Sequence, residues 1–171
     1  MTDRATDRVA VYTDGACRGN PGPGGWAWAV APEGMPRGTG GEAQSTNQRM
    51  EIKAALEAMR SLPGPMIVRS DSTYVVNCVN KKWYVGWKRN GWRNSAKQPV
   101  ANQDLWRPFF EIYDPQRHTF EWVKGHSGDR MNDMVDALAV AASKGPFDAP
   151  PPPPSPRADP PVQPAPAATL F

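Results

Sequence analysis

The chain has few cysteines and no long apolar segment, and each shortage argues against a class of protein. Only two of its 171 residues, Cys17 and Cys78, are cysteines, and they form no CxxC pair. This usage argues against a disulfide framework and a structural zinc site. No apolar stretch approaches the roughly 20 residues that cross a bilayer, and the initial MTDRATDR lacks the apolar core of a secretory signal peptide. We therefore expect a soluble, cytoplasmic protein with reduced cysteines and no membrane partner.

The C-terminal segment lacks the apolar residues that a folded core needs. Eleven of the 20 prolines lie in residues 146–171, which carry only three charged side chains. Such a composition favours disorder or polyproline II structure. We therefore predict one folded domain over residues 1–145 and a proline-rich, disordered tail over residues 146–171.

The basic residues are concentrated in one segment. The whole chain has a net charge of +3, yet residues 81–97 hold six basic residues and no acidic one. The rest of residues 1–143 holds 12 basic and 15 acidic residues, a net charge of −3. A solvated helix face is the ordinary explanation for such a segment, but exposed tryptophans are unfavourable without a ligand. Tryptophans and cations alternate here, as is typical of nucleic-acid binding: Trp83, Trp87 and Trp92 with Lys88, Arg89 and Arg93.

Hydrophobic periodicity predicts an α/β fold that opens with antiparallel strands. Residues 8–13 and 26–31 alternate in polarity as strand partners joined through a Gly/Pro-rich turn, and residues 37–44 fit a short third strand. From Thr46 the apolar residues recur at helical spacing, until Leu-Pro-Gly at residues 62–64 ends the helix.

The next apolar segment, residues 65–71, predicts a strand that follows this helix. A right-handed crossover through the helix places this strand parallel to the first strand and beside it. Later segments predict two helices, a strand and a last helix, over residues 72–80, 102–113 with a kink at Pro108, 118–124 and 132–143. The expected fold is a mixed five-stranded sheet, antiparallel in its first three strands and parallel thereafter, with helices on both faces.

Four carboxylates occupy positions where structure alone does not require a charge. Asp14 and Asp71 end two of the predicted strands, where each can also serve simply as a turn residue. Glu51 lies at the margin of the first helix's apolar stripe, where a solvated side chain is common. Asp136 interrupts an otherwise apolar run at residues 134–142, although a carboxylate near a helix N-terminus is also favoured by the helix dipole.

These four side chains can converge at one edge of the sheet. Their mutual repulsion is unfavourable unless cations lie between them, and hard divalent metals are the cations that carboxylates prefer. Two metal ions about 4 Å apart can hold both the attacking and the leaving oxygen in phosphoryl transfer. The pattern therefore predicts a divalent-metal site for phosphate chemistry.

Five sequence blocks resemble bacterial-type ribonuclease H. They occur in the family's order over residues 9–143: YTDGACRGNPGPGGWAW, STNQRMEIKAALEA, SDSTYV, WKRNGW and WVKGHSGDRMNDMVDALA. The resemblance implies a ribonuclease H-like fold and hydrolysis of the RNA strand of RNA–DNA hybrids, with 5′-phosphate products. It also implies that Asp14, Glu51, Asp71 and Asp136 bind two Mg²⁺ ions, for which Mn²⁺ can substitute. We expect the enzyme to act as a monomer.

The resemblance also implies which residues contact the RNA strand. A protein tells RNA from DNA by the 2′-hydroxyl, which needs hydrogen-bond donors and acceptors nearby. In the family these groups lie at positions that match Cys17, Asn20 and Asn47, and backbone groups near Gly15 and Gly19 would contribute.

Further roles follow from the same resemblance. Thr46 would hold a phosphate of the DNA strand, in addition to capping its helix. The segment 81–97 resembles the family's basic protrusion, which grips the DNA strand. His126 would assist proton transfer and product release, work that suits histidine; a plain surface loop is the alternative. Two positions depart from the family pattern: Thr73 stands where a glutamine often contacts RNA, and Asp133 stands where a glutamate is common.

Two other functions stay open from the sequence, and one hypothesis concerns the tail. A hybrid-binding module without cleavage would need only the basic segment, and a DNA-cutting relative can use the same fold. The tail ends in ATLF, whose Leu170 and Phe171 loosely resemble peptides that dock on bacterial sliding clamps. A protein partner for the tail is therefore a hypothesis, with a frayed terminus of no function as the alternative.

Overall fold

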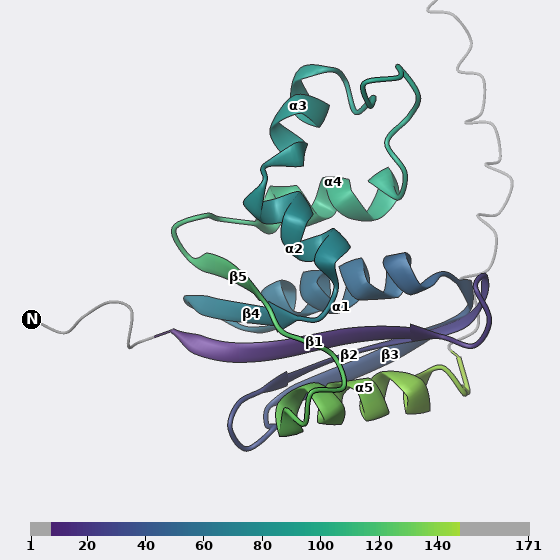
Figure 1. Cartoon of the computed structure of the whole chain (residues 1–171), viewed down its shortest axis with the longest axis vertical. Helices are drawn as coiled ribbons and strands as arrows, with labels where there is room; N and C mark the ends of the chain where they lie inside the picture. The colour runs from purple at the N-terminus through teal and green to yellow at the C-terminus, as the bar shows by residue number, and fades with distance from the viewer. Residues whose placement is uncertain (1–7, 148–171) are drawn as a thin grey trace, which may run out of the picture.

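The structure, a computed structural model, describes residues 8–147 and consists of one mixed sheet with helices on both sides (Figure 1). The strands are β1 (Val9–Cys17), β2 (Gly22–Val30), β3 (Arg37–Ser45), β4 (Met66–Ser70) and β5 (His118–Trp122). The helices are α1 (Asn47–Ser61), α2 (Thr73–Asn80), α3 (Trp83–Arg89), α4 (Gln103–Ile112) and α5 (Arg130–Ala142). The hypothesis about the end of the tail falls outside the described residues.

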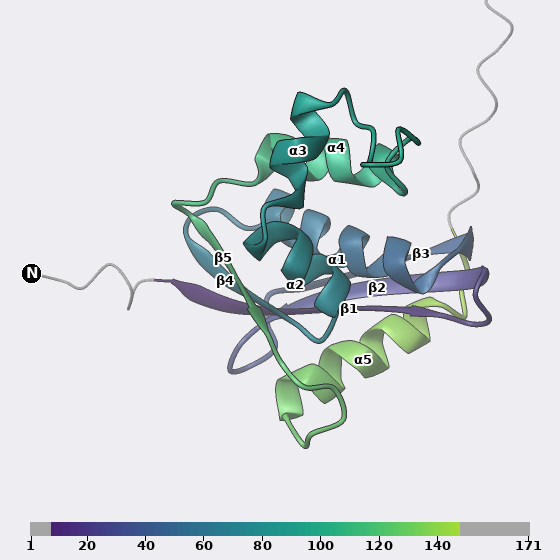
Figure 2. The same ribbon diagram turned by 45° about the horizontal axis from the view of Figure 1, so that its top comes forward.

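The sheet has the order β3-β2-β1-β4-β5. β2 pairs antiparallel with both β1 and β3, whereas β4 lies parallel to β1 and β5 lies parallel to β4. Figure 2 shows α1 to α4 on one side of the sheet and α5 on the other. The predicted five-stranded mixed sheet with helices on both faces is confirmed. Within residues 8–147, none of the helices is long and apolar enough to span a bilayer.

The Gly/Pro-rich stretch after Asp14 is mostly strand, whereas the sequence suggested a turn. β1 continues to Cys17 and β2 begins at Gly22, so only residues 18–21 connect them. The prediction that the first strand ends at Asp14 is therefore wrong, because this carboxylate lies inside a longer strand.

Close helix packing explains why this stretch is rich in glycine. A Cβ on Gly15 would overlap the backbone of α1 at Met50, and a Cβ on Gly25 would overlap the backbone of α5 at Ala139. The glycines therefore allow two helices to approach the same strand pair from opposite faces. This approach brings side chains of α1 and α5 to the strand that carries Asp14.

Two apolar cores hold the layers together. The larger core joins the sheet to α1, α2 and α4 and contains Ile52, Val68 and Trp106, all fully buried. The smaller core lies under α5, where Ala27 and Val135 are fully buried. Small side chains on the strand let α5 lie close to the sheet.

The helix boundaries follow from their caps. α1 begins after Thr46, whose side chain accepts a hydrogen bond from the Arg49 backbone amide at 3.2 Å, as the sequence predicts. α5 begins at Arg130, two residues earlier than expected, because Asp129 accepts hydrogen bonds from two backbone amides of the first turn. Pro108 lies inside α4 as expected.

Candidate active site

Asp14 and Asp71 lie at the end of the parallel ladder between β1 and β4. The last parallel pair is Thr13 with Ser70, and each aspartate is the next residue of its chain. Asp14 is only 5% exposed, while Asp71 is half-buried. The expected position of both carboxylates at one edge of the parallel ladder is confirmed, although β1 itself runs on past Asp14.

Glu51 and Asp136 approach this pair from opposite faces of the sheet. Glu51 projects from α1, and its Oε2 accepts a 2.7 Å hydrogen bond from the Ser72 hydroxyl. Asp136 projects from α5, and its charge helps to raise the pKa of the Asp14 carboxyl group. The four predicted carboxylates therefore come from the interior of β1, the residue after β4 and two helices, and they act on one another electrostatically.

Burial and mutual repulsion raise the pKa values of these carboxyl groups. The pKa of Asp14 rises from 3.8 to about 8, chiefly because burial removes water and then because Asp71 and Asp136 repel its charge. Burial likewise raises the pKa of Glu51, and the hydrogen bond from Ser72 opposes part of that effect. Without a cation, the site therefore disfavours having all of these carboxyl groups charged at once.

The donor set fits a hard divalent cation such as Mg²⁺. Within residues 8–147, no three acidic, histidine or cysteine side chains stand close enough together to hold a metal ion as they lie. Mg²⁺, however, usually takes one or two carboxylates and fills its other positions with water and substrate phosphates. Every candidate ligand here offers carboxylate oxygens, and mutual repulsion among them is relieved by a cation. The site thus fits Mg²⁺ by charge and donor type, with a phosphate completing the coordination.

Asn132 and Ser72 support the carboxylates, and neither was among the predicted site residues. Burial raises the pKa of Asp71, and the side chain of Asn132, which is itself only 2% exposed, opposes part of that effect. The Asn132 Oδ1 atom is buried without a hydrogen-bond partner among the described residues. Asn132 lies one helical turn before Asp136 in the sequence, and this spacing was the signal that could have revealed it.

His126 lies on the loop between β5 and α5, beside the acidic edge. It is exposed, its φ is +54°, and it opposes part of the rise that burial causes in the pKa of Asp71. The neighbouring Gly125 passes so close to Asp71 that a Cβ there would lie 2.8 Å from a carboxylate oxygen. The structure therefore brings the predicted histidine to the carboxylates.

The residues predicted to contact the RNA strand lie together at the N-terminus of α1. Asn20 is exposed, and its Oδ1 accepts a hydrogen bond from the Asn47 backbone amide at 3.2 Å. The Cys17 thiol lies 3.1 Å from the Gly22 carbonyl oxygen and 3.3 Å from the Ser45 carbonyl oxygen, and its single hydrogen is donated to this pair of acceptors. The thiol hydrogen is therefore used inside the protein, which leaves the asparagines and backbone as the groups available to a substrate.

Thr46 stands at the same helix end. Because its hydroxyl oxygen accepts the capping hydrogen bond, the hydroxyl hydrogen can still be donated to a phosphate. The helix N-terminus adds a favourable field for an anion. The predicted double role of Thr46 is therefore compatible with its geometry.

The tryptophans of the basic segment are less exposed than the sequence suggested. Trp83 is 36% exposed, but Trp87 and Trp92 are half-buried. The Trp87 ring lies between those of Trp92 and Trp106, with centroid distances of 6.1 and 6.0 Å. The expectation of an exposed aromatic surface is therefore wrong for two of the three rings, which anchor the segment to the core through α4.

The cations of this segment remain at the surface. Lys88 and Arg89 lie in the last turn of α3, where cations are favoured by the helix dipole. Arg93 donates to the Lys97 carbonyl at 3.0 Å. None of these three cations takes part in an ion pair within residues 8–147, so their charges are available to a phosphate backbone.

The sheet order and the four converging carboxylates define a class of protein, namely one with the ribonuclease H fold. Residues 6–144 match the RNase H family model. Ribonuclease H of Syntrophomonas wolfei subsp. wolfei is 49% identical over 140 residues, which cover 80% of this chain and 96% of that protein. Ribonuclease H of Moorella thermoacetica is 51% identical over 140 residues, covering 78% and 90%. The chain therefore belongs to the RNase H family of enzymes.

Solved structures agree with this assignment. LC9-RNase H1, described as a type 1 RNase H with the type 2 active-site motif, is 29% identical with a TM-score of 0.67, covering 80% of this chain and 72% of that chain. LC11-RNase H1, solved in complex with an RNA/DNA hybrid, is 19% identical with a TM-score of 0.60, covering 80% and 97%. Because LC11-RNase H1 is only 19% identical, its similarity to this chain supports the fold alone.

Proposed function

We propose that this protein is an endonuclease that hydrolyses the RNA strand of RNA–DNA hybrids with two Mg²⁺ ions. The observation that carries the proposal is the buried Asp14 carboxyl group, whose pKa is raised to about 8 beside Asp71 and Asp136. A repelling carboxylate cluster is unfavourable for the fold alone, but it suits a site that binds cations together with phosphate. Family membership supports the ribonuclease activity.

The reaction exchanges one phosphoester bond. A water oxygen bonds to phosphorus, the bond from phosphorus to the 3′ oxygen breaks, and the products carry a 5′-phosphate and a 3′-hydroxyl. When bound, two divalent ions would activate the water and stabilise the leaving oxygen. Asp14, Asp71, Asp136 and Glu51 would hold these ions through their carboxylate oxygens. His126, exposed beside Asp71, carries a proton between the site and solvent and helps the product leave.

Residues around α1 and α3 orient the hybrid. Asn20 and Asn47 supply amide and backbone groups for the 2′-hydroxyl of the RNA strand. Thr46 donates its free hydroxyl hydrogen to a phosphate of the DNA strand. The exposed cations of α3 and the following loop neutralise further phosphates, which makes hybrid binding sensitive to salt.

A cleavage assay on three substrates tests the proposal. Labelled hybrid, duplex RNA and duplex DNA are incubated with the protein in Mg²⁺ and, separately, in EDTA. We expect cleavage of the RNA strand of the hybrid in Mg²⁺ and no cleavage in EDTA. Binding without cleavage would instead indicate a hybrid-binding module, and cleavage of duplex DNA would indicate a DNA-cutting relative.

A further inference from the structure

A chain of hydrogen bonds crosses the sheet beneath α5. Tyr12 of β1 is paired with Arg69 of β4, and Arg69 is paired with Glu121 of β5, so the three residues form one row. Residues in one row of a sheet point to the same face. Arg69 donates to Glu121 at 3.2 Å and to the Tyr12 hydroxyl at 3.4 Å. The Tyr12 hydroxyl in turn lies 3.2 Å from Oδ2 of Asp129, the residue that caps α5.

The chemistry of these groups determines the direction of each hydrogen bond. A guanidinium group can only donate, and a carboxylate can only accept. The Tyr12 hydroxyl therefore accepts from Arg69 and donates its single hydrogen to Asp129. The other oxygen of Asp129, Oδ1, accepts from the backbone amides of Met131 at 3.0 Å and Asn132 at 3.3 Å. One carboxylate oxygen thus holds the start of α5, and the other holds the sheet.

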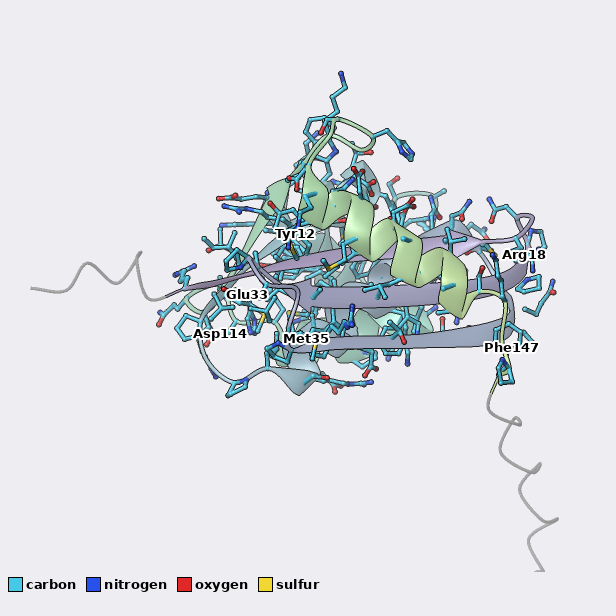
Figure 3. The ribbon with its side chains drawn as sticks, turned by 90° about the horizontal axis from the view of Figure 1, so that it is seen from below. Tyr12, Arg18, Glu33, Met35, Asp114 and Phe147 are labelled. Carbon is cyan, nitrogen blue, oxygen red and sulfur yellow. The ribbon has the colours of Figure 1, made fainter. Side chains whose placement is uncertain are left out.

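The contact between Tyr12 and Asp129 lies on the strand and the helix that carry the catalytic groups. Tyr12 and Asp14 are two residues apart on β1 and therefore point to the same face. Asp129, Asn132 and Asp136 are separated by three and four residues and therefore share one side of α5. Figure 3 shows Tyr12 beside the N-terminal end of that helix. The hydrogen bond from Tyr12 to Asp129 therefore joins the strand that carries Asp14 to the start of the helix that carries Asp136.

The same contact holds one end of the loop that carries His126. At the start of the loop, the Val123 amide donates to the Ser70 carbonyl at 3.0 Å. At its end, Asp129 is held by Tyr12. His126 lies between these two points with its side chain exposed. Loss of the hydrogen bond between Tyr12 and Asp129 can therefore shift the position of both α5 and His126.

We propose that Tyr12 is a positioning residue of the active site. Its hydroxyl, oriented by Arg69, fixes Asp129 and so fixes where the first turns of α5 place Asn132 and Asp136 relative to Asp14. It also fixes one end of the His126 loop. The kinetic part of this inference rests on the proposed function, whereas the contact itself can be measured without catalysis.

Tyr12→Phe tests the inference because it removes only the hydroxyl and keeps the packed ring. We expect the hybrid-cleavage kcat to fall about tenfold with KM within about twofold, because sub-ångström misplacement of catalytic groups costs rate more than binding. The Mg²⁺ concentration for half-maximal rate should rise. Tyr113→Phe is the matched control, since its hydroxyl makes no hydrogen bond within residues 8–147, and its kcat should equal that of the wild type.

Variants at Asp129 separate positioning from simple stability. Asp129→Ser keeps a capping side chain but is too short to keep the contact with Tyr12. We expect Asp129→Ser to lower kcat as much as Tyr12→Phe does, and the double variant to be no worse than either. Asp129→Asn keeps both an acceptor for Tyr12 and a capping side chain, so this variant should retain most of the wild-type kcat.

Amide hydrogen exchange gives a readout that does not depend on activity. The amides of Met131 and Asn132 should exchange faster in Tyr12→Phe, while amides in α1 keep their wild-type rates. A Tyr12→Phe enzyme with wild-type kcat and unchanged exchange at these amides would overturn the inference, as would rate losses that multiply in the double variant. If the wild-type protein does not cleave hybrids, the proposed function fails, and the exchange measurement still decides whether Tyr12 holds α5.

Discussion

The Ser72 hydroxyl donates a 2.7 Å hydrogen bond to Glu51 and accepts one from the Val75 amide at 3.2 Å. A hydroxyl can do both because it has one hydrogen and two lone pairs. This single buried side chain therefore caps α2 and orients a carboxylate that projects from α1. Removing this hydroxyl should therefore affect both the stability of the fold and the position of Glu51, and the two effects can be measured separately.

Ser72→Ala should lower both stability and activity. Loss of the cap costs about 1 kcal/mol of unfolding free energy. Loss of the donor removes the interaction that lowers the pKa of Glu51, so that this group binds a cation less well. We expect a several-fold rise in the Mg²⁺ concentration needed for half-maximal cleavage, measured by titration.

Two control variants accompany Ser72→Ala. Ser72→Thr keeps the hydroxyl and should retain most of the wild-type Mg²⁺ response, whereas Ser61→Ala, at the exposed end of α1, should change neither stability nor the Mg²⁺ response. An unaltered Mg²⁺ titration in Ser72→Ala would contradict the role given to this bond.

Asp14→Asn should abolish cleavage and, without metal, stabilise the fold at alkaline pH. The folded-state pKa of Asp14 is raised to about 8, above its ordinary 3.8. Between these values the unfolded chain loses its proton while the folded chain keeps it, so wild-type stability falls as pH rises from about 4 to 8. An uncharged Asn escapes this loss and should gain several kcal/mol relative to the wild type between pH 4 and pH 8, since each pKa unit corresponds to about 1.4 kcal/mol.

Urea unfolding in EDTA at pH 4 and pH 8 measures this effect. The two proteins should differ little at pH 4 and most at pH 8, and added Mg²⁺ should stabilise the wild type more than Asp14→Asn. Hybrid affinity should be largely unchanged in the variant. A cleavage rate of Asp14→Asn within about tenfold of the wild type would contradict the assignment of Asp14 as a metal ligand.

Replacing Lys88, Arg89 and Arg93 by Ala should weaken hybrid binding and reduce its dependence on salt. For each phosphate that the protein no longer neutralises, the slope of log affinity against log salt becomes shallower by about 0.7–0.9. Cleavage at saturating hybrid should persist, because these cations lie outside the acidic edge. A charge-matched control replaces three arginines elsewhere on the surface, Arg37, Arg60 and Arg117, and should leave the slope unchanged. If both triple variants changed the salt dependence of hybrid affinity equally, the effect would come from net charge and not from contacts of this segment with the hybrid.

His126→Ala should slow turnover without loss of hybrid affinity. A proton carrier aids the chemical step and product release but does not hold the substrate. We expect kcat to fall by about 10²-fold, within the range for general acid–base groups. Hybrid binding measured in Ca²⁺ should match the wild type, and a parallel loss of affinity would indicate a binding role. Ser127→Ala, next on the same exposed loop, is the control for loss of loop structure.

Residue patterns alone were enough to predict most of the fold and to single out the four carboxylates that the structure brings to one region. Alternating apolar residues predicted the strands, helical spacing predicted α1, and the crossover rule placed β4 beside β1. These features depend on local sequence and on chain handedness, so they are visible without coordinates. The same local rules singled out Asp14 and Asp71 at the ends of predicted strands, and Glu51 and Asp136 beside apolar positions of helices.

Only the tertiary structure decided features that depend on contacts between distant segments. The glycines near Gly15 looked like a turn, because the sequence does not show that α1 and α5 press on both faces of the strands there. Trp87 looked exposed, because its packing partner Trp106 lies in a later helix. The link from Tyr12 to Asp129 spans 117 residues and has no periodic signal. Local patterning thus determined which segments form strands and helices and which carboxylates are unusual. Packing between those segments decided how deeply each group is buried, which hydrogen bonds hold it and how far its pKa moves, because burial and neighbouring charge are properties of the assembled structure.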